Sequence, residues 1–134
     1  MMRFFLAFVL VVLAGAASAQ APSAPQLGNP ASLRCIERGG MVRIEARPDG
    51  GQYGICVFAD NYQCEEWAMF RGNCPVGGLR VTGFVTRAAR YCAITGGRYA
   101  VAANSGLPDE QGACTLPSGT ICDAVAYFAG RCGP

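Results

Sequence analysis

The chain of 134 residues contains no histidine and no lysine. The absence of histidine excludes the Ser-His-Asp and Cys-His arrangements that activate a nucleophile in many hydrolases. The absence of lysine excludes a Schiff base with a carbonyl substrate. Glu65 and Glu66 are neighbours on a predicted helix, so their side chains point about 100° apart and do not face each other across a substrate. We expect both to be solvated helix-start acids, and the protein to be non-enzymatic, with no catalytic residues and no cofactor.

Net charge is also scarce. Eleven arginines are nearly balanced by nine carboxylates, and removal of Arg3 with a signal segment would leave ten arginines. A balance this close gives no electrostatic reason to expect nucleic acid or an anionic membrane as the partner. We expect no nucleic acid partner and no stable membrane insertion. The partner that we expect is an unidentified envelope or extracellular protein or ligand, which depends on the export signal described next.

A long apolar run occurs at the N-terminus alone. Phe4 to Leu13 is almost wholly apolar, follows Arg3 and precedes the small residues Ala17-Ser18-Ala19, which is the pattern of a secretory signal peptide. The run is shorter than the ~20 residues that a membrane span needs. Ala16 stands where a lipidated cysteine would be required, so a lipid anchor is not expected. We predict a signal peptide over 1–19, a flexible leader over 20–28, and a periplasmic or secreted protein.

Cysteine, by contrast, is abundant, and its spacing repeats. Eight cysteines form two sets of four, offset by 57 or 58 residues: Cys35, Cys56, Cys64, Cys74, Cys92, Cys114, Cys122 and Cys132. In each set, seven residues separate the second cysteine from the third, and nine separate the third from the fourth. A glycine pair follows the first cysteine of each set, at Gly39-Gly40 and Gly96-Gly97. The repeat predicts two tandem modules, 29–74 and 86–132, joined by a linker over 75–85 that has room for a strand.

Even numbers of cysteines in a small exported chain indicate disulfides. A zinc site built from four cysteines is the alternative, but the sequence has no C-x-x-C pair, so we predict no metal site. A module of about 45 residues buries little apolar surface. Two disulfides per module, at about 2–4 kcal/mol each, would then decide whether it folds.

The pairing of the cysteines is harder to predict, because four cysteines allow three connectivities. If Cys64 and Cys74 bracket one helix, they lie roughly 15 Å apart, whereas a disulfide needs Cα atoms within about 7 Å. Cys64 then pairs with Cys35 or with Cys56. We favour Cys56–Cys64 with Cys35–Cys74, because a short turn brings the first pair close. The second module would repeat this as Cys114–Cys122 with Cys92–Cys132.

The first helix of each module has clear start and stop signals. Asn29-Pro30 supplies a cap and a first-turn proline, and Thr86 takes the cap position in the second module. Glycine pairs end both helices. Two strands follow in each module, around turns rich in glycine, and form a β-hairpin.

A second helix is expected to close each module. Gln63 to Gly72 has acidic residues in its first turn and Arg71 near its end, both of which favour a helix. Ile121 to Ala129 is the equivalent segment of the second module. The fold predicted for each module is therefore helix, β-hairpin, helix, which belongs to the α+β class.

The first module contains the motifs Gly54-x-Cys56-x-Phe58 and Cys64-Glu65-Glu66-Trp67-Ala68-x-Phe70-Arg71-Gly72-x-Cys74. These motifs resemble a bacterial domain family of unknown function, whose members are often labelled hemolysins. The resemblance covers about residues 29–132 and is weaker in the second module, where Val125 replaces the tryptophan and Ala129 the arginine. It implies a small exported protein with one or two copies of the domain, and it brings no catalytic residues.

We interpret the chain as a non-enzymatic, disulfide-rich envelope or secreted module with a binding or structural role. The first alternative is a protease inhibitor that presents Arg47, which lies beside the first hairpin turn. A hemolysin-like membrane-active protein is the second, although no long amphipathic segment follows the signal. Trp67 and Phe70 are spaced so that they lie on one side of a helix, and we expect that side to pack in the core. The alternative interpretation is that the two rings form a surface that binds a ligand. Arg47 and Trp67 are thus the candidate binding residues.

Overall fold

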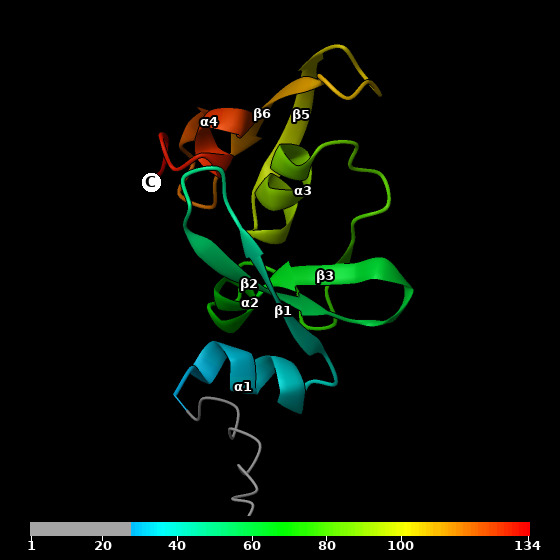
Figure 1. The fold of residues 1–134 in the computed structure, drawn as a ribbon, viewed down its shortest axis with the longest axis vertical. Coiled ribbons are helices and arrows are strands. Elements are labelled where there is room, and N and C mark those ends of the chain that lie inside the picture. Colours follow the sequence, from blue (N-terminus) through cyan, green and yellow to red (C-terminus); the bar gives the residue numbers. More distant parts are fainter. Residues whose placement is uncertain (1–27) are drawn as a thin grey trace, which may run out of the picture.

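The computed structural model describes residues 28–134, which form two modules that lie one above the other in Figure 1. The predicted signal peptide and all but the last residue of the predicted leader lie outside the described residues. Each module has a helix, three antiparallel strands and a short second helix. The α+β class and the two disulfide-stapled modules are confirmed.

The first module begins and ends with a helix. Its elements are α1 (Pro30–Glu37), β1 (Met41–Ala46), β2 (Gln52–Val57), the single-turn 3-10 helix η1 (Ala59–Asn61), β3 (Tyr62–Glu65) and α2 (Glu66–Phe70). The linker adds a two-residue strand, β4 (Leu79–Arg80), so that the sheet has the order β1-β2-β3-β4.

The second module repeats this order without a fourth strand. Its elements are α3 (Arg87–Ile94), β5 (Arg98–Ala103), β6 (Gln111–Thr115), β7 (Ile121–Asp123) and α4 (Ala124–Phe128). The strands pair antiparallel in the order β5-β6-β7, with a register shift between Val101 and Ala103.

Side-chain caps fix the start of the first helix in both modules, as predicted. Asn29 Oδ1 accepts the backbone N–H groups of Ala31 and Ser32 at 3.0 and 3.3 Å. Thr86 Oγ1 accepts the N–H of Ala89 at 3.1 Å. These bonds satisfy donors that have no partner inside the helix.

The second helices are shorter than predicted, because a third strand occupies their expected first residues. Cys64 lies in β3 directly opposite Cys56 of β2, and Cys122 lies in β7 opposite Cys114 of β6. Glu65 keeps an extended backbone, with φ −65° and ψ 134°, since its side chain caps α2. Each of α2 and α4 therefore has five residues.

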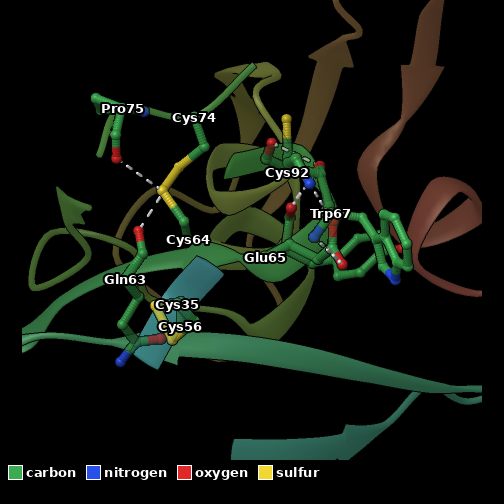
Figure 2. The surroundings of a disulfide bond; sticks show 12 residues. Cys35, Cys56, Gln63, Cys64, Glu65, Trp67, Cys74, Pro75 and Cys92 are labelled. Carbon is green, nitrogen blue, oxygen red and sulfur yellow. Dashed lines mark hydrogen bonds between the residues drawn. A yellow bond between two sulfur atoms is a disulfide. The ribbon is translucent and has the colours of Figure 1, made fainter. Parts of the chain in front are cut away.

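The favoured disulfide pairing is wrong in both modules. The bonds are Cys35–Cys56, Cys64–Cys74, Cys92–Cys114 and Cys122–Cys132, with Cα–Cα distances of 5.6, 5.9, 5.7 and 5.9 Å. The exclusion of Cys64–Cys74 assumed one continuous helix between them. In the structure, α2 ends at Phe70 and Gly72 turns the chain back with φ +82°. That reversal returns Cys74 to the strand that carries Cys64 (Figure 2).

The repeated glycine pairs have two separate functions. Gly39 and Gly96 adopt φ +84° and +93° at the ends of α1 and α3, a conformation that other residues rarely adopt. A Cβ at Gly40 would lie 2.4 Å from Cys56 Sγ, and one at Gly97 would lie 2.5 Å from Cys114 Sγ. The second glycine thus leaves room for the disulfide that joins helix to hairpin.

The larger hydrophobic core is built mainly by the second module and extends into the first. Tyr53 and Ile55 of β2 are 7% and 0% exposed, and they pack with Tyr91 and Ile94 of α3 and with Phe128 of α4. A second, smaller cluster surrounds the two disulfides of the first module. The first module thus contributes Tyr53 and Ile55 to a core that it shares with the second.

An ion-pair cluster also joins the modules. Glu45 of β1 accepts hydrogen bonds from Arg90 of α3 at 2.7 Å and from Tyr53 at 3.0 Å. Arg43 lies 3.1 Å and Arg87 3.6 Å from the same carboxylate. The contacts of Arg90 and Arg87 with Glu45 Oε2 therefore hold α3 of the second module against β1 of the first.

Replacing Glu45 with glutamine is expected to lower the free energy of unfolding by about 1–3 kcal/mol at pH 7. Burial alone would raise the pKa of Glu45, but the Tyr53 hydrogen bond and the charges of Arg90, Arg43 and Arg87 outweigh it and lower the pKa. The stabilisation is present above the unfolded pKa of about 4.3 and is lost as the pH falls through the lower folded pKa.

Thermal melts between pH 7 and pH 3 test this. The wild type should lose stability below about pH 5 more steeply than Glu45→Gln. Glu37→Gln, at an exposed position on α1, is the control and should follow the wild type. Equal pH slopes for wild type and Glu45→Gln would contradict the prediction.

Candidate binding groove between the modules

Two adjoining hollows run along the junction of the modules. The larger, of about 620 Å³, is walled by the start of α1, the β1–β2 hairpin and α2. The smaller, of about 390 Å³, lies between the end of α2, α3 and the turn after β6. Glu65, Arg71 and Tyr91 line both hollows. We call the two together the inter-module groove.

The hairpin that carries Arg47 reaches across to the second module, where its turn lies beside α4 in Figure 1. A Cβ added at Gly130 would lie 2.6 Å from Asp49 Oδ2, so the contact is close. Arg47 Nη1 donates to the Tyr91 hydroxyl at 3.4 Å, and Nε lies 3.4 Å from Asp49 Oδ1. The hydrogen bond to Tyr91 raises the pKa of Arg47, which therefore keeps its charge.

Trp67 lines the same hollow as Arg47, so the two residues that the sequence singled out lie in one site. The expectation of a core tryptophan is wrong, since Trp67 is 37% exposed. Figure 2 shows its indole directed away from the disulfides. Because α2 starts at Glu66, its inward side carries Ala68 and Met69, and Trp67 packs edge-on against the exposed ring of Phe70, with centroids 5.5 Å apart.

Glu65 and Glu66 are buried, at 7% and 3% exposed, and are not the solvated acids that the sequence suggested. Glu65 accepts the N–H groups of Trp67 and Ala68 at 3.0 and 2.7 Å (Figure 2). Burial raises the pKa of Glu65, and these two hydrogen bonds offset the rise in part. The carboxylate therefore belongs to the floor of the groove.

Sequence reasoning missed a polar cluster beside Trp67. Glu66 accepts hydrogen bonds from Asn29 Nδ2 at 2.9 Å and from Ser32 Oγ at 2.5 Å. Its carboxyl group occupies the space above Gly54, where a Cβ would lie 2.4 Å from Cδ. The sequence did contain one indication of this cluster. Glu66, the second residue of the Glu-Glu pair, has the apolar Ala124 as its counterpart in the other module.

The equivalent place in the second module is filled differently. Thr86, Ala89 and Ala124 stand where the first module has Asn29, Ser32 and Glu66. Gly112, the counterpart of Gly54, faces the ring of Tyr99, whose hydroxyl donates to Glu110 at 2.9 Å. The polar hollow is thus specific to the first module, although one of its walls comes from the second.

Across residues 28–134, no three His, Cys, Asp or Glu side chains gather in a way that could hold a metal ion. No helix in that range has both the length and the apolar character to cross a membrane. What the groove offers chemically is a set of aromatic rings, amides and guanidinium groups around buried carboxylates.

These features define a small α+β protein made of two tandem modules, each closed by two disulfides. The chain belongs to the family described as "Domain of unknown function (DUF333)", whose family model matches residues 26–73 and 83–131. It is 36% identical over 73 residues to the uncharacterized protein YoaF of Escherichia coli strain K12 and to that of Shigella flexneri. The match covers 51% of this chain and 86% of each relative. No solved structure shows a significant match.

Proposed function

We propose that this protein is a non-enzymatic binding module of the cell envelope or the extracellular space, and that the inter-module groove holds its ligand. The exposure of Trp67 carries the proposal: a large indole stands 37% exposed at the wall of a hollow. Concave sites lined by aromatic rings and a few polar groups are typical of ligand binding. Four disulfides hold the surrounding elements in place.

Export is part of the proposal. The basic start, apolar run and small residues before Gln20 support signal cleavage near Ala19. Disulfides persist in oxidising compartments such as the periplasm and the extracellular space. The mature protein would then meet its ligand in the periplasm or outside the cell.

The one tryptophan of the chain makes the groove directly observable. We expect Trp67 fluorescence to be quenched readily by iodide in the folded protein, and to be protected when purified peptidoglycan fragments, lipopolysaccharide or a peptide library supplies a ligand. Trp67→Ala should weaken binding measured by calorimetry at least tenfold. Its stability should fall by only about 1–2 kcal/mol, because the ring is already partly in water.

Val125→Ala is the matched control, since Val125 occupies the equivalent position of the second module and is 49% exposed. It should leave binding unchanged. A tryptophan that iodide does not reach would contradict the proposal, and so would equal losses of affinity in the two variants.

The inhibitor alternative is less well supported by the geometry at Arg47. An inhibitor presents its primary residue on an extended, accessible loop, whereas Arg47 closes a turn. Its N–H donates to Gly51 O at 2.7 Å, and Gly50 N–H donates back to Arg47 O at 3.0 Å. We expect no inhibition of a panel of trypsin-like proteases and no lysis of erythrocytes.

A further inference from the structure

We propose that the inter-module groove binds the free C-terminal carboxylate of a peptide with an apolar last residue, and that Arg71 is the group that binds this carboxylate. The inference rests on the proposed function, because it names the ligand class of the same groove. The evidence is that the acceptors of the groove already have hydrogen-bond partners within the protein, whereas some of its donors have none.

The acceptors of the groove floor are used. Each oxygen of Glu65 accepts one backbone N–H, and each oxygen of Glu66 accepts one side-chain donor. Both residues are less than a tenth exposed, so a ligand reaches little of either carboxylate. The floor is therefore a poor site for a ligand cation, although it carries two acidic residues.

The donors at the junction of the two hollows are free. Arg71 is exposed, and while its backbone N–H donates to the Trp67 carbonyl at 2.9 Å, its guanidinium has no hydrogen-bond or ion-pair partner among residues 28–134. A guanidinium carries five N–H donors in a planar fork that matches the two oxygens of a carboxylate. The hydroxyl of Tyr91 accepts from Arg47, so its own hydrogen is left to donate to the same ligand oxygen.

The surroundings of Arg71 fit the rest of a peptide end. Trp67 and the 56% exposed Ile44 line the larger hollow and offer apolar surface for the last side chain. Asn73 and Ser118 line the smaller hollow, where they can meet the amide groups of the preceding residues. Capture of a terminal carboxylate together with an apolar side chain is a recurrent mode of peptide recognition.

Tripeptides of identical sequence test the inference on the full mature protein. N-acetyl-Ala-Ala-Leu with a free carboxylate is compared with its C-terminal amide, using Trp67 fluorescence and the NMR signal of the indole N–H. We expect the free acid to bind at least tenfold more tightly than the amide. Arg71→Gln should weaken the free acid by at least tenfold and leave the amide unchanged. Arg98→Gln, at an exposed position on β5 outside both hollows, should change neither.

Several results would overturn the inference. They are equal binding of acid and amide, full binding by Arg71→Gln, and binding of a glucuronic acid disaccharide or of inorganic phosphate in preference to the peptide acid. Failure of both tripeptides to perturb Trp67 would also overturn it. The proposed function is tested separately, because the comparison of Trp67→Ala with Val125→Ala measures binding to the groove whether or not the ligand has a terminal carboxylate.

Discussion

Replacing Tyr91 with alanine is expected to lower the free energy of unfolding by about 3–5 kcal/mol, a large part of the stability of a domain of this size. Tyr91 is 7% exposed, and its ring packs on Tyr53, Tyr127 and Phe128 with centroids 5.0 to 5.1 Å apart. The substitution would leave a cavity where the two modules meet. Because the core is shared, we expect both modules to lose stability in one transition.

Urea unfolding followed by circular dichroism measures this effect. Tyr62→Ala is the control, because Tyr62 is only half-buried in β3 and has Arg80 5.6 Å above its ring. We expect it to cost about 1 kcal/mol or less. A Tyr91→Ala protein that unfolds in two separate steps, or that is as stable as Tyr62→Ala, would show that the modules are independent.

Removing the Cys35–Cys56 disulfide by a double substitution to alanine is expected to cost about 2–5 kcal/mol. The bond closes a loop between residues 21 positions apart, and both sulfurs lie in the buried cluster beneath α1. Without it, α1 is attached to β2 by packing alone. Chemical denaturation under non-reducing conditions gives the loss.

The Cys122–Cys132 bond provides the comparison for this prediction. It closes a span of 10 residues near the C-terminus, and Cys132 is only half-buried, so its removal should cost less. Proteolysis of the oxidised protein followed by mass spectrometry should recover Cys35 linked to Cys56. Recovery of Cys56 linked to Cys64 would refute the connectivity on which both expectations rest.

The sequence predicted the repeat, the helix caps and the use of disulfides because each depends on residues close together in the chain. Asn29 and Thr86 cap helices through bonds to residues two and three positions away. The error in the cysteine pairing also began locally. An extended Glu65 and a reversal at Gly72 shorten α2 to five residues, and neither change alters the hydrophobic pattern.

The candidate site was predicted only in pieces. Arg47 and Trp67 were identified one at a time, but their meeting in one hollow depends on how the β1–β2 hairpin crosses to the second module. The inward side of a five-residue helix likewise depends on its starting residue, which decides whether Trp67 or Ala68 is buried. Packing between residues far apart in the chain determines both the path of the hairpin and the first residue of α2. A single sequence contains no local pattern that indicates such packing.

The order of the disulfides bears on how the chain acquires its structure. Eight cysteines can pair in 105 ways. In the native set the first cysteine in the chain is bonded to the second, the third to the fourth, and so on: Cys35 to Cys56, Cys64 to Cys74, Cys92 to Cys114, Cys122 to Cys132. A chain that enters an oxidising compartment N-terminus first therefore meets the correct partner of each new thiol before any wrong one. Strictly sequential oxidation reaches the native connectivity with no bond broken and remade. An oxidase alone would suffice for its maturation, and the loss of a disulfide isomerase would leave the yield of native protein unchanged.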